Sequence, residues 1–131
     1  MENEAPVVRL TDAILLSALA RGAQQVRIRA RDRGSCVVEL QIDGQVHEEM
    51  RPPALLLAPI VRRLSIMASL PIYPRGGSAS GFLHLRIGEV RAAYFAIVVT
   101  GHGAAMSATL REITEEEYNK ADPSGSTGIY R

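Results

Sequence analysis

Alternating runs of apolar and polar residues dominate the first half of the chain. They cover residues 26–31, 36–42 and 45–50, and Asp43-Gly44 separates the last two runs. Such alternation places successive side chains on opposite faces of a sheet. Asp-Gly is a strong hairpin signal because both residues tolerate positive φ. The sequence therefore predicts three antiparallel strands over residues 26–50.

The two faces of this predicted sheet differ in chemistry. The residues expected to face the core are apolar: Val26, Ile28, Ala30, Cys36, Val38, Leu40 and Ile42. The residues expected on the opposite face are basic on one strand and acidic or polar on the next: Arg27, Arg29, Arg31, Glu39, Gln41 and Asp43. Because cross-strand neighbours of opposite charge attract, we expect this second face to neutralise itself.

Two amphipathic helices are predicted beside the sheet. Apolar residues recur at helical spacing over 7–21, with Thr11 as a cap at the start and Gly22 as the glycine after the end. A second helix is expected to start between residues 54 and 59 and to continue to about Ser69. Its predicted buried stripe consists of Ile60, Val61, Leu64, Met67 and Ala68. Arg62, Arg63 and Ser65 are expected to face water.

Three further strands are predicted at 82–87, 90–100 and 104–113, which gives about six in total. Residues 71–81 contain three glycines and two prolines without periodicity, which is typical of an exposed loop. Residues 1–6 are expected to be a flexible lead-in, and residues 114–131 a linker-like C-terminal tail. The domain proper is predicted to span residues 7–113.

Composition indicates an ordinary globular protein. A chain of 131 residues is long enough for one domain with its own core. The net charge of +1 gives no general attraction to nucleic acid or anionic lipid. No apolar run approaches the roughly 20 residues of a membrane span, and the N-terminus lacks a signal-peptide pattern. We expect a cytoplasmic protein without a membrane span.

Motifs for catalysis are missing from the sequence. No glycine-rich loop is followed by Lys and Ser or Thr, as a phosphate-binding P-loop requires. His47, His84 and His102 fall on three separate predicted elements, without zinc-ligand spacing. The single cysteine, Cys36, is predicted to face inward, where a thiol is inert. We expect no catalytic residues, no metal and no cofactor, and thus no enzyme activity.

The arginine-rich stretch 26–33 is the one feature whose guanidinium groups could bind phosphate. Acidic residues on the neighbouring strand argue against this role. An aromatic content of 5% also leaves few rings on which nucleic-acid bases could stack. Nucleic acid is therefore not a favoured partner.

Three stretches resemble a known family. They are V-V-R-L-T-D-A-I-L-L-S-A-L-A-R-G-A at 7–23, Q-I-D-G-Q-V-H-E-E-M-R-P-P at 41–53 and I-V-R-R-L-S-I-M-A-S-L at 60–70. They are similar to the domain that precedes the ATPase core in type II secretion and type IV pilus assembly ATPases, the GspE/PilB group. The resemblance covers about residues 7–113. It implies a PAS-like α+β domain, in which two main helices pack on one face of an antiparallel sheet of about six strands.

The first departures from the family pattern lie in the opening sheet. Where the family reads A-S-D-I-H-I-E-P, this chain reads A-Q-Q-V-R-I-R-A. Arg27 and Arg29 therefore occupy the positions of the histidine and the glutamate. Gln41 replaces the arginine of the family's R-I-D-G motif.

The other departures concern nucleotide contact. The family's R-R-L-P-Q-D-G-R loop corresponds to residues 75–82, which keep Arg75 but place Phe82 at the last arginine. A later arginine of the family falls on Tyr94. In the family, arginines of this domain reach nucleotide bound by the adjacent ATPase core, so these aromatic replacements remove charge that matches phosphate.

The resemblance and its departures predict a stand-alone, non-catalytic relative of this domain. We expect an interaction or regulatory module of a pilus, secretion or motility system. Its expected partner is a protein, such as a secretion or pilus ATPase or another motility component, and self-association stays open. The candidate partner-binding residues are Arg27, Arg29, Gln41, Arg75, Phe82 and Tyr94. The alternative is a PAS-like sensor that binds a small ligand between helix and sheet.

Overall fold

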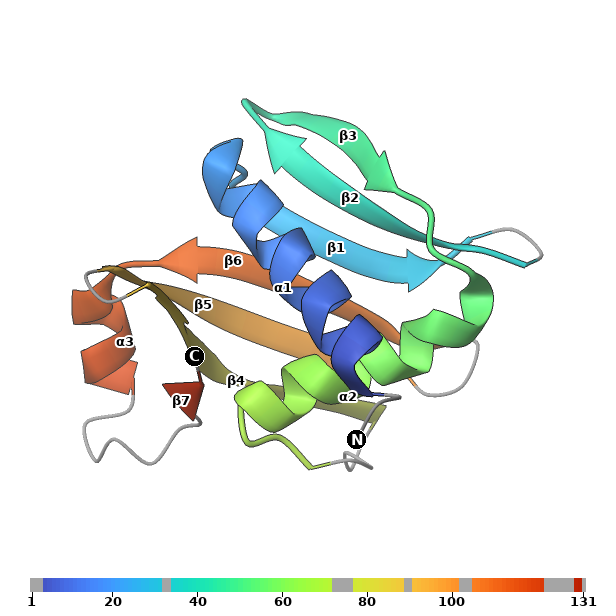
Figure 1. The fold of residues 1–131 in the computed structure, drawn as a ribbon. Helices are drawn as coiled ribbons and strands as arrows, with labels where there is room; N and C mark the ends of the chain where they lie inside the picture. The colour runs from blue at the N-terminus through green and yellow to red at the C-terminus, as the bar shows by residue number, and fades with distance from the viewer. Residues whose placement is uncertain are drawn as a thin grey trace.

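The computed structural model shows a single sheet with helices packed against it (Figure 1). It describes residues 4–31, 34–71, 77–88, 91–101, 105–121 and 129–130. The helices are α1 (Glu4–Ala20), the short 3-10 helix η1 (Ala54–Leu56), α2 (Leu57–Met67) and α3 (Glu115–Ala121). The strands are β1 (Gln25–Ala30), β2 (Cys36–Ile42), β3 (Gln45–Met50), β4 (Ser78–Ile87), β5 (Arg91–Thr100), β6 (Ser107–Ile113) and β7 (Ile129–Tyr130).

The sheet has the strand order β3-β2-β1-β6-β5-β4-β7. Strands β1 to β6 pair antiparallel throughout, and the two residues of β7 add a short parallel pairing to β4. Strand β1 therefore lies in the middle of the sheet, next to β6 from the other end of the chain. The predicted α+β class with six antiparallel strands is confirmed.

The hairpin between β2 and β3 forms as its sequence predicts. Asp43 has φ of 53° and Gly44 has φ of 79°. Two central residues with positive φ are characteristic of the type I′ turn, whose twist matches that of the flanking strands. The register Ile42↔Gln45 and Gln41↔Val46 follows directly from this turn.

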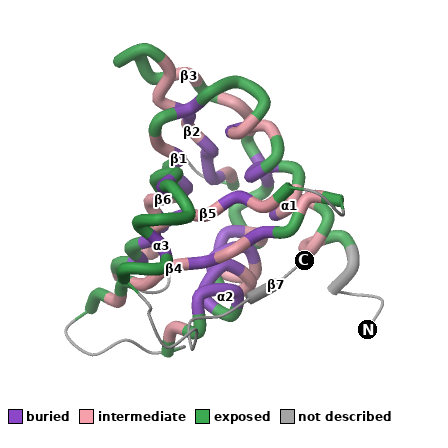
Figure 2. The backbone as a smooth tube through the Cα atoms, turned by 90° about the vertical axis from the view of Figure 1, so that its left-hand side faces the viewer, coloured by how far each residue is buried: buried purple, intermediate pink, exposed green. Residues whose placement is uncertain are grey.

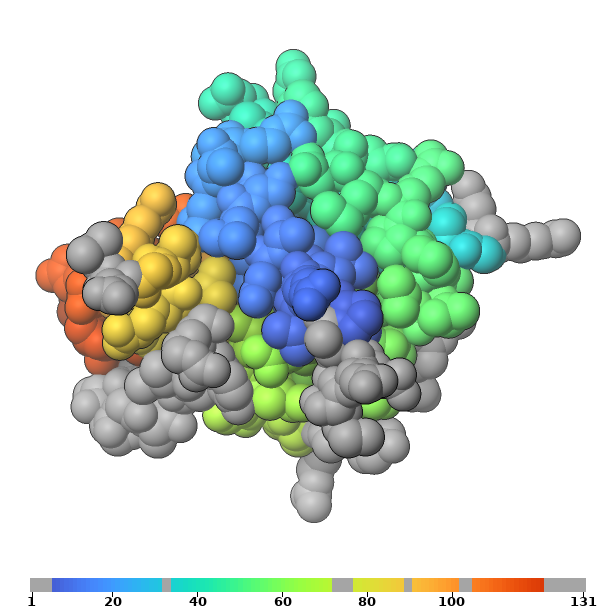
Figure 3. Space-filling view, viewed as in Figure 1, coloured from blue at the N-terminus to red at the C-terminus, as the bar shows by residue number. Residues whose placement is uncertain are grey.

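Helices α1 and α2 cover one face of the sheet, whereas α3 lies on the other side (Figures 1 and 2). In the space-filling view, α1 in blue lies against α2 in green on the face toward the viewer (Figure 3). The core between these helices and the sheet is built from large apolar side chains. They include Ile14, Leu15, Ile60, Leu64 and Met67 from the helices and Val26, Ile28, Leu40, Phe95 and Leu110 from the sheet, all at most 1% exposed.

The helices differ from the prediction at two polar residues. Thr11 does not cap α1, because the helix begins at Glu4; its buried hydroxyl donates to the Val7 carbonyl, 2.8 Å away. Ser65 is buried, while Ile66 is 43% exposed. The predicted stripe of α2 is otherwise confirmed, and Gly22 adopts the expected positive φ of 67° after α1.

Strand β4 begins four residues before the predicted start at Phe82, inside the segment read as a loop. Gly81 is part of this strand, and a β-carbon there would lie 2.8 Å from Cδ2 of Leu70. Leu70 packs against the core, so the glycine allows it to approach the strand. The glycine was predicted to belong to a loop, whereas in the fold it allows Leu70 to pack closely against β4.

No helix in the described ranges is both long and apolar enough to cross a membrane.

Packing of α2 on the sheet should account for much of the stability of the fold. Leu64→Ala removes a side chain that is fully buried against the sheet, and we expect it to lower the free energy of unfolding by about 2–5 kcal/mol. Ile66→Ala on the exposed side of the same helix should cost less than about 1 kcal/mol. Urea unfolding followed by circular dichroism measures both. Equal losses would contradict the assigned orientation of α2.

Candidate interaction surface

The sheet face turned away from α1 and α2, which we call the outer face, carries most of the residues that the sequence singled out. Five of the six candidate residues lie on it: Arg27, Arg29, Gln41, Phe82 and Tyr94. Each alternates along its strand with residues of the core, as strand geometry requires. The sixth, Arg75, lies outside the described residues. The fold thus gathers candidates from β1, β2, β4 and β5 on one surface.

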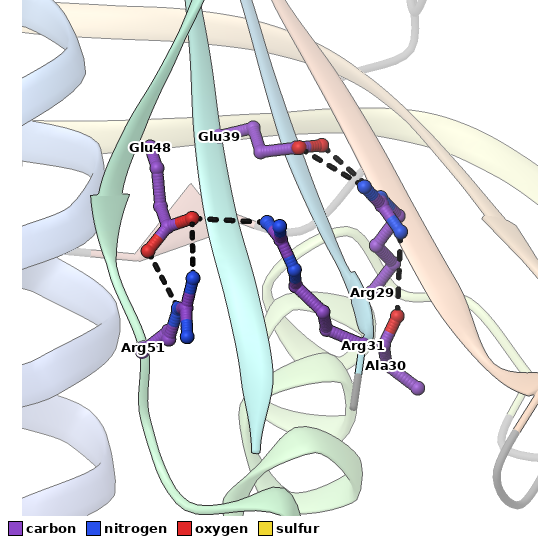
Figure 4. Close-up of polar contacts among 6 residues, drawn as sticks. All are labelled: Arg29, Ala30, Arg31, Glu39, Glu48 and Arg51. Atoms are coloured by element: carbon purple, nitrogen blue, oxygen red, sulfur yellow. Dashed lines mark hydrogen bonds and ion pairs between the residues drawn. The ribbon is translucent and has the colours of Figure 1, made fainter. Parts of the chain in front are cut away.

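Ion pairs neutralise the end of the outer face formed by β1, β2 and β3 (Figure 4). Arg29 donates two parallel hydrogen bonds to Glu39, from Nε at 3.1 Å and from Nη2 at 3.0 Å. Hydrogen bonding to Glu39 raises the pKa of the Arg29 guanidinium. Arg31 and Arg51 both bind Glu48, which links the end of β1 to β3. The predicted cross-strand neutralisation of this face is confirmed there.

The two neighbouring glutamates of β3 face opposite sides of the sheet, as strand alternation requires, and a β-bulge lies beside them. Glu48 is the register partner of Glu39 on the outer face, whereas Glu49 falls in the register shift. Glu49 instead accepts hydrogen bonds from Ser17 and Arg21 at the end of α1. The Ser17 hydrogen bond and the Arg21 charge hold the pKa of Glu49 below its ordinary value. Glu49 therefore ties the edge strand to the helix layer.

Aromatic rings cover the end of the outer face near β4 and β5. His84 and Tyr94 stack with a centroid distance of 4.9 Å and an interplanar angle of 14°. Tyr118 of α3 lies 4.9 Å from Tyr94 in a tilted arrangement and is itself buried. Burial lowers the pKa of His84 and raises the pKa of Tyr94. Tyr94 therefore packs against its own chain, in a cluster of three rings that all contact one another.

Helix α3 begins with a reciprocal cap that the sequence analysis did not use. The Glu117 amide donates to Thr114 Oγ1 at 3.0 Å, and the Thr114 amide donates to the Glu117 carboxylate at 2.9 Å. Thr-x-x-Glu is the sequence signature of this capping box. The predicted tail from residue 114 therefore starts with a helix that Tyr118 anchors to the outer face. A capping search would have found its first turn.

The remaining candidates on the outer face are less constrained. Arg27 is exposed, Gln41 is half-buried, and Phe82 is half-buried opposite Ala96 of β5. Next to Tyr94, a cavity of about 620 Å³ opens between β5, β6 and α3, with Arg111 and Glu115 among its lining residues. One arginine and three glutamates, Glu112, Glu115 and Glu117, line this cavity, so its lining is net negative and favours a cation over an anion.

The structure offers little room for the alternative function as a ligand sensor. A small ligand was expected between helix and sheet, but the helices fill that space with Ile14, Ile60 and Leu64, which are at most 1% exposed. Cys36 is also fully buried there, and burial raises the pKa of its thiol. Among the described residues, no three His, Cys, Asp or Glu side chains come together as a metal site would require.

Comparison with known proteins identifies relatives in secretion and pilus systems. A family model described as "Type II/IV secretion system protein" matches residues 1–122. The chain is 36% identical over 86 residues to the type IV pilus assembly ATPase PilB of Myxococcus xanthus, covering 66% of this chain and 15% of that protein. It is 33% identical over 87 residues to type II secretion system protein E of Klebsiella pneumoniae, covering 66% and 17%. The chain thus spans about one sixth of the length of these relatives.

Two solved structures share the fold. The Legionella pneumophila ATPase DotB matches 79% of this chain and 29% of its own with a TM-score of 0.58 at 17% identity. The ADP-bound pilus retraction motor PilT matches 78% and 28% with a TM-score of 0.50 at 15% identity. These likenesses concern the arrangement of helices and strands.

The capping box should determine how firmly α3 stays folded on the outer face. Thr114→Ala and Glu117→Ala each remove one half of the cap, and we expect each to destabilise α3 by about 1 kcal/mol. Amide hydrogen exchange in residues 115–121 should then be about fivefold faster. Glu116→Ala is the control, because Glu116 lies exposed on the same helix outside the cap. Equal exchange in all three variants would contradict this role of the cap.

Proposed function

This chain belongs to the type II/IV secretion system protein family, and we propose that it works as a non-catalytic interaction or regulatory module. In this proposal the described fold corresponds to the N-terminal domain that precedes the ATPase core in type II secretion and type IV pilus ATPases. Its partner is a protein of a pilus, secretion or motility system, with an ATPase of that system as the first candidate. Self-association is a second way to cover the same surface.

The observation that carries the proposal is the open outer face. Helices α1 and α2 cover the other face, and among the described residues α3 covers the outer face near Tyr94 and lies beside Arg111. Val98 near the C-terminal end of β5 remains 42% exposed on the outer face, and Val46 on β3 is 65% exposed. Val98 also neighbours the half-buried Ala96 and Phe82 on this face, and a contiguous exposed apolar patch is typical of a surface that a second protein covers.

The non-catalytic part of the proposal rests on the residues at the positions of the family's arginines. Phe82 and Tyr94 carry no positive charge, and Tyr94 stacks on His84 and contacts Tyr118. A guanidinium there would be able to neutralise phosphate oxygens, whereas a stacked phenol cannot. The 131 residues also contain no phosphate-binding loop with Lys and Ser or Thr. These features support a module that binds a partner without turning over nucleotide.

Matched charge insertions on the two faces test the proposal. Val98 on the outer face is 42% exposed and Ile66 on α2 is 43% exposed, so Val98→Asp and Ile66→Asp make comparable changes on opposite sides. We expect a tagged chain in its native host to co-purify with a secretion, pilus or motility component. Val98→Asp should reduce its recovery about tenfold or more, while Ile66→Asp should leave it unchanged, as measured by quantitative mass spectrometry.

Three results would contradict the proposal. The first is recovery of no component of such a system. The second is loss of the component with Ile66→Asp but not with Val98→Asp. The third is hydrolysis of Mg-ATP by the purified chain above the rate in buffer, since it would remove the non-catalytic part.

A further inference from the structure

We propose that the half of the outer face between β4 and β1 is a docking site for an acidic amphipathic helix of a partner protein. This inference rests on the proposed function and names the chemistry of the partner. We call this site the docking patch. Its apolar half consists of Phe82, Ala96 and Val98, and its cationic half of Arg111 and Arg27, with Thr109 between them.

The strand register places these six residues in two neighbouring rows. Phe82 lies opposite Ala96, and Ala96 lies opposite Arg111. In the second row, two residues away from the first on β5 and β6, Val98 lies opposite Thr109. Thr109 in turn lies opposite Arg27 of β1. Each row thus runs from an apolar side on β4 or β5 to an arginine on β6 or β1. With strands about 4.8 Å apart, the patch is on the order of 14 Å wide, enough for one helix of about 10–12 Å diameter.

The cationic half lacks the neutralisation found elsewhere on the outer face. Glu39 is the register partner of Arg27, but both of its carboxylate oxygens accept hydrogen bonds from Arg29. Arg27 is exposed and forms no ion pair with the described residues. Arg111 is also exposed and forms no ion pair with the described residues, but it lines the cavity beside Glu115 and Glu117 of α3, and its charge helps to lower the pKa of Glu117. Arg27 therefore remains for an anionic partner, and Arg111 adds a second positive charge that α3 offsets in part.

The geometry of the two arginines fits a helix with paired acids. Arg27 and Arg111 are diagonal neighbours across β1 and β6, and such neighbours lie about 7–8 Å apart. Acidic residues at positions i and i+4 of a helix lie about 5–6 Å apart, within reach of both guanidinium groups. An apolar stripe beside them would cover Val98 and the half-buried Phe82 and Ala96.

The apolar half of the docking patch favours a protein helix over other anions. A phosphate backbone would match the arginines but would leave Val98 and Ala96 without an apolar partner. An anionic membrane surface attracts clusters of four or more cations, whereas this patch has two. The Tyr94 ring already stacks on His84 and contacts Tyr118, which limits its use as a platform for base stacking.

A synthetic peptide pair tests the partner chemistry with the full 131-residue chain. The probe is an 18-residue peptide, labelled with a fluorophore, that carries a leucine stripe and two Glu residues at i and i+4 beside it. The first control has Lys in place of both Glu residues. The second control has the same composition as the probe in an order without a stripe. Fluorescence anisotropy at low and high salt should show binding of the probe at least about tenfold tighter than of either control, and weaker binding at high salt.

Variants of the chain assign that binding to the docking patch. Arg27→Glu and Arg111→Glu combined should weaken probe binding about tenfold or more, and Val98→Asp should do likewise. Arg9→Glu is the matched control, because Arg9 is exposed on α1 on the other side of the molecule. Circular dichroism verifies that all variants fold. Equal binding of the Glu and Lys peptides, unchanged binding by the double variant, or equal loss with Arg9→Glu would overturn the inference.

Other ligands provide further outcomes that would overturn it. The chain is also tested with a single-stranded oligonucleotide and with vesicles that contain a third of anionic lipid. Binding of either one that is tighter than that of the probe, and that is lost with Arg27→Glu and Arg111→Glu, would assign the patch to that ligand instead.

The inference and the proposed function fail in different ways. If the host complex is lost with Val98→Asp but persists with the double arginine variant, the outer face binds a partner of different chemistry, and the acidic helix is refuted. If no host complex depends on the outer face while the peptide still binds as expected, the proposed function fails and the docking chemistry stands.

Discussion

Two helices pack on one face of a six-stranded antiparallel sheet, and the arrangement of the rest of the molecule depends on this one-sided covering. An antiparallel sheet can be stable with a single buried face, provided that the other face is polar or is covered by something else. Here the buried face takes nearly all of the large apolar side chains, including Ile28, Leu64 and Phe95. The outer face is therefore free to vary without loss of the core.

The outer face must be polar or covered, and it meets this requirement in different ways along the sheet. At β1, β2 and β3, carboxylates and guanidinium groups pair across the strands. Near β4 and β5, α3 covers the stacked rings of His84 and Tyr94 through Tyr118. Between these regions, the docking patch has neither ion pairs nor a helix over it among the described residues. The patch is thus where a partner gains most, since it can bury apolar surface and pair two cations at once.

Local patterns in the sequence predicted much of the fold. Alternation assigned the faces of β1 and β2, the Asp43-Gly44 turn fixed the hairpin, and helical spacing identified the buried stripe of α2. These features depend on residues close in sequence, so the sequence reveals them. The same alternation put five of the six candidate residues on one face.

Features that depend on distant contacts were missed. Gly81 looked like a loop residue because its role is to admit Leu70, which no local pattern shows. The sequence also does not predict which arginine forms the ion pair with Glu39. Arg27 lies directly opposite that residue, yet Arg29 forms the bidentate pair from the diagonal position. The unneutralised Arg27 of the docking patch follows from that pairing.

Radical footprinting of side chains would test most directly whether the outer face is the interaction surface. The chain offers an internal comparison, since Val98 and Val46 are exposed on the outer face and Leu55 and Ile66 on η1 and α2. Oxidation by hydroxyl radicals is measured by mass spectrometry for the purified chain and for the chain in extract of its host. We predict that oxidation of Val98 falls severalfold in the extract, while Leu55 and Ile66 react as before. Protection of Leu55 and Ile66 with Val98 unchanged would contradict the account, because the partner would then cover the helices.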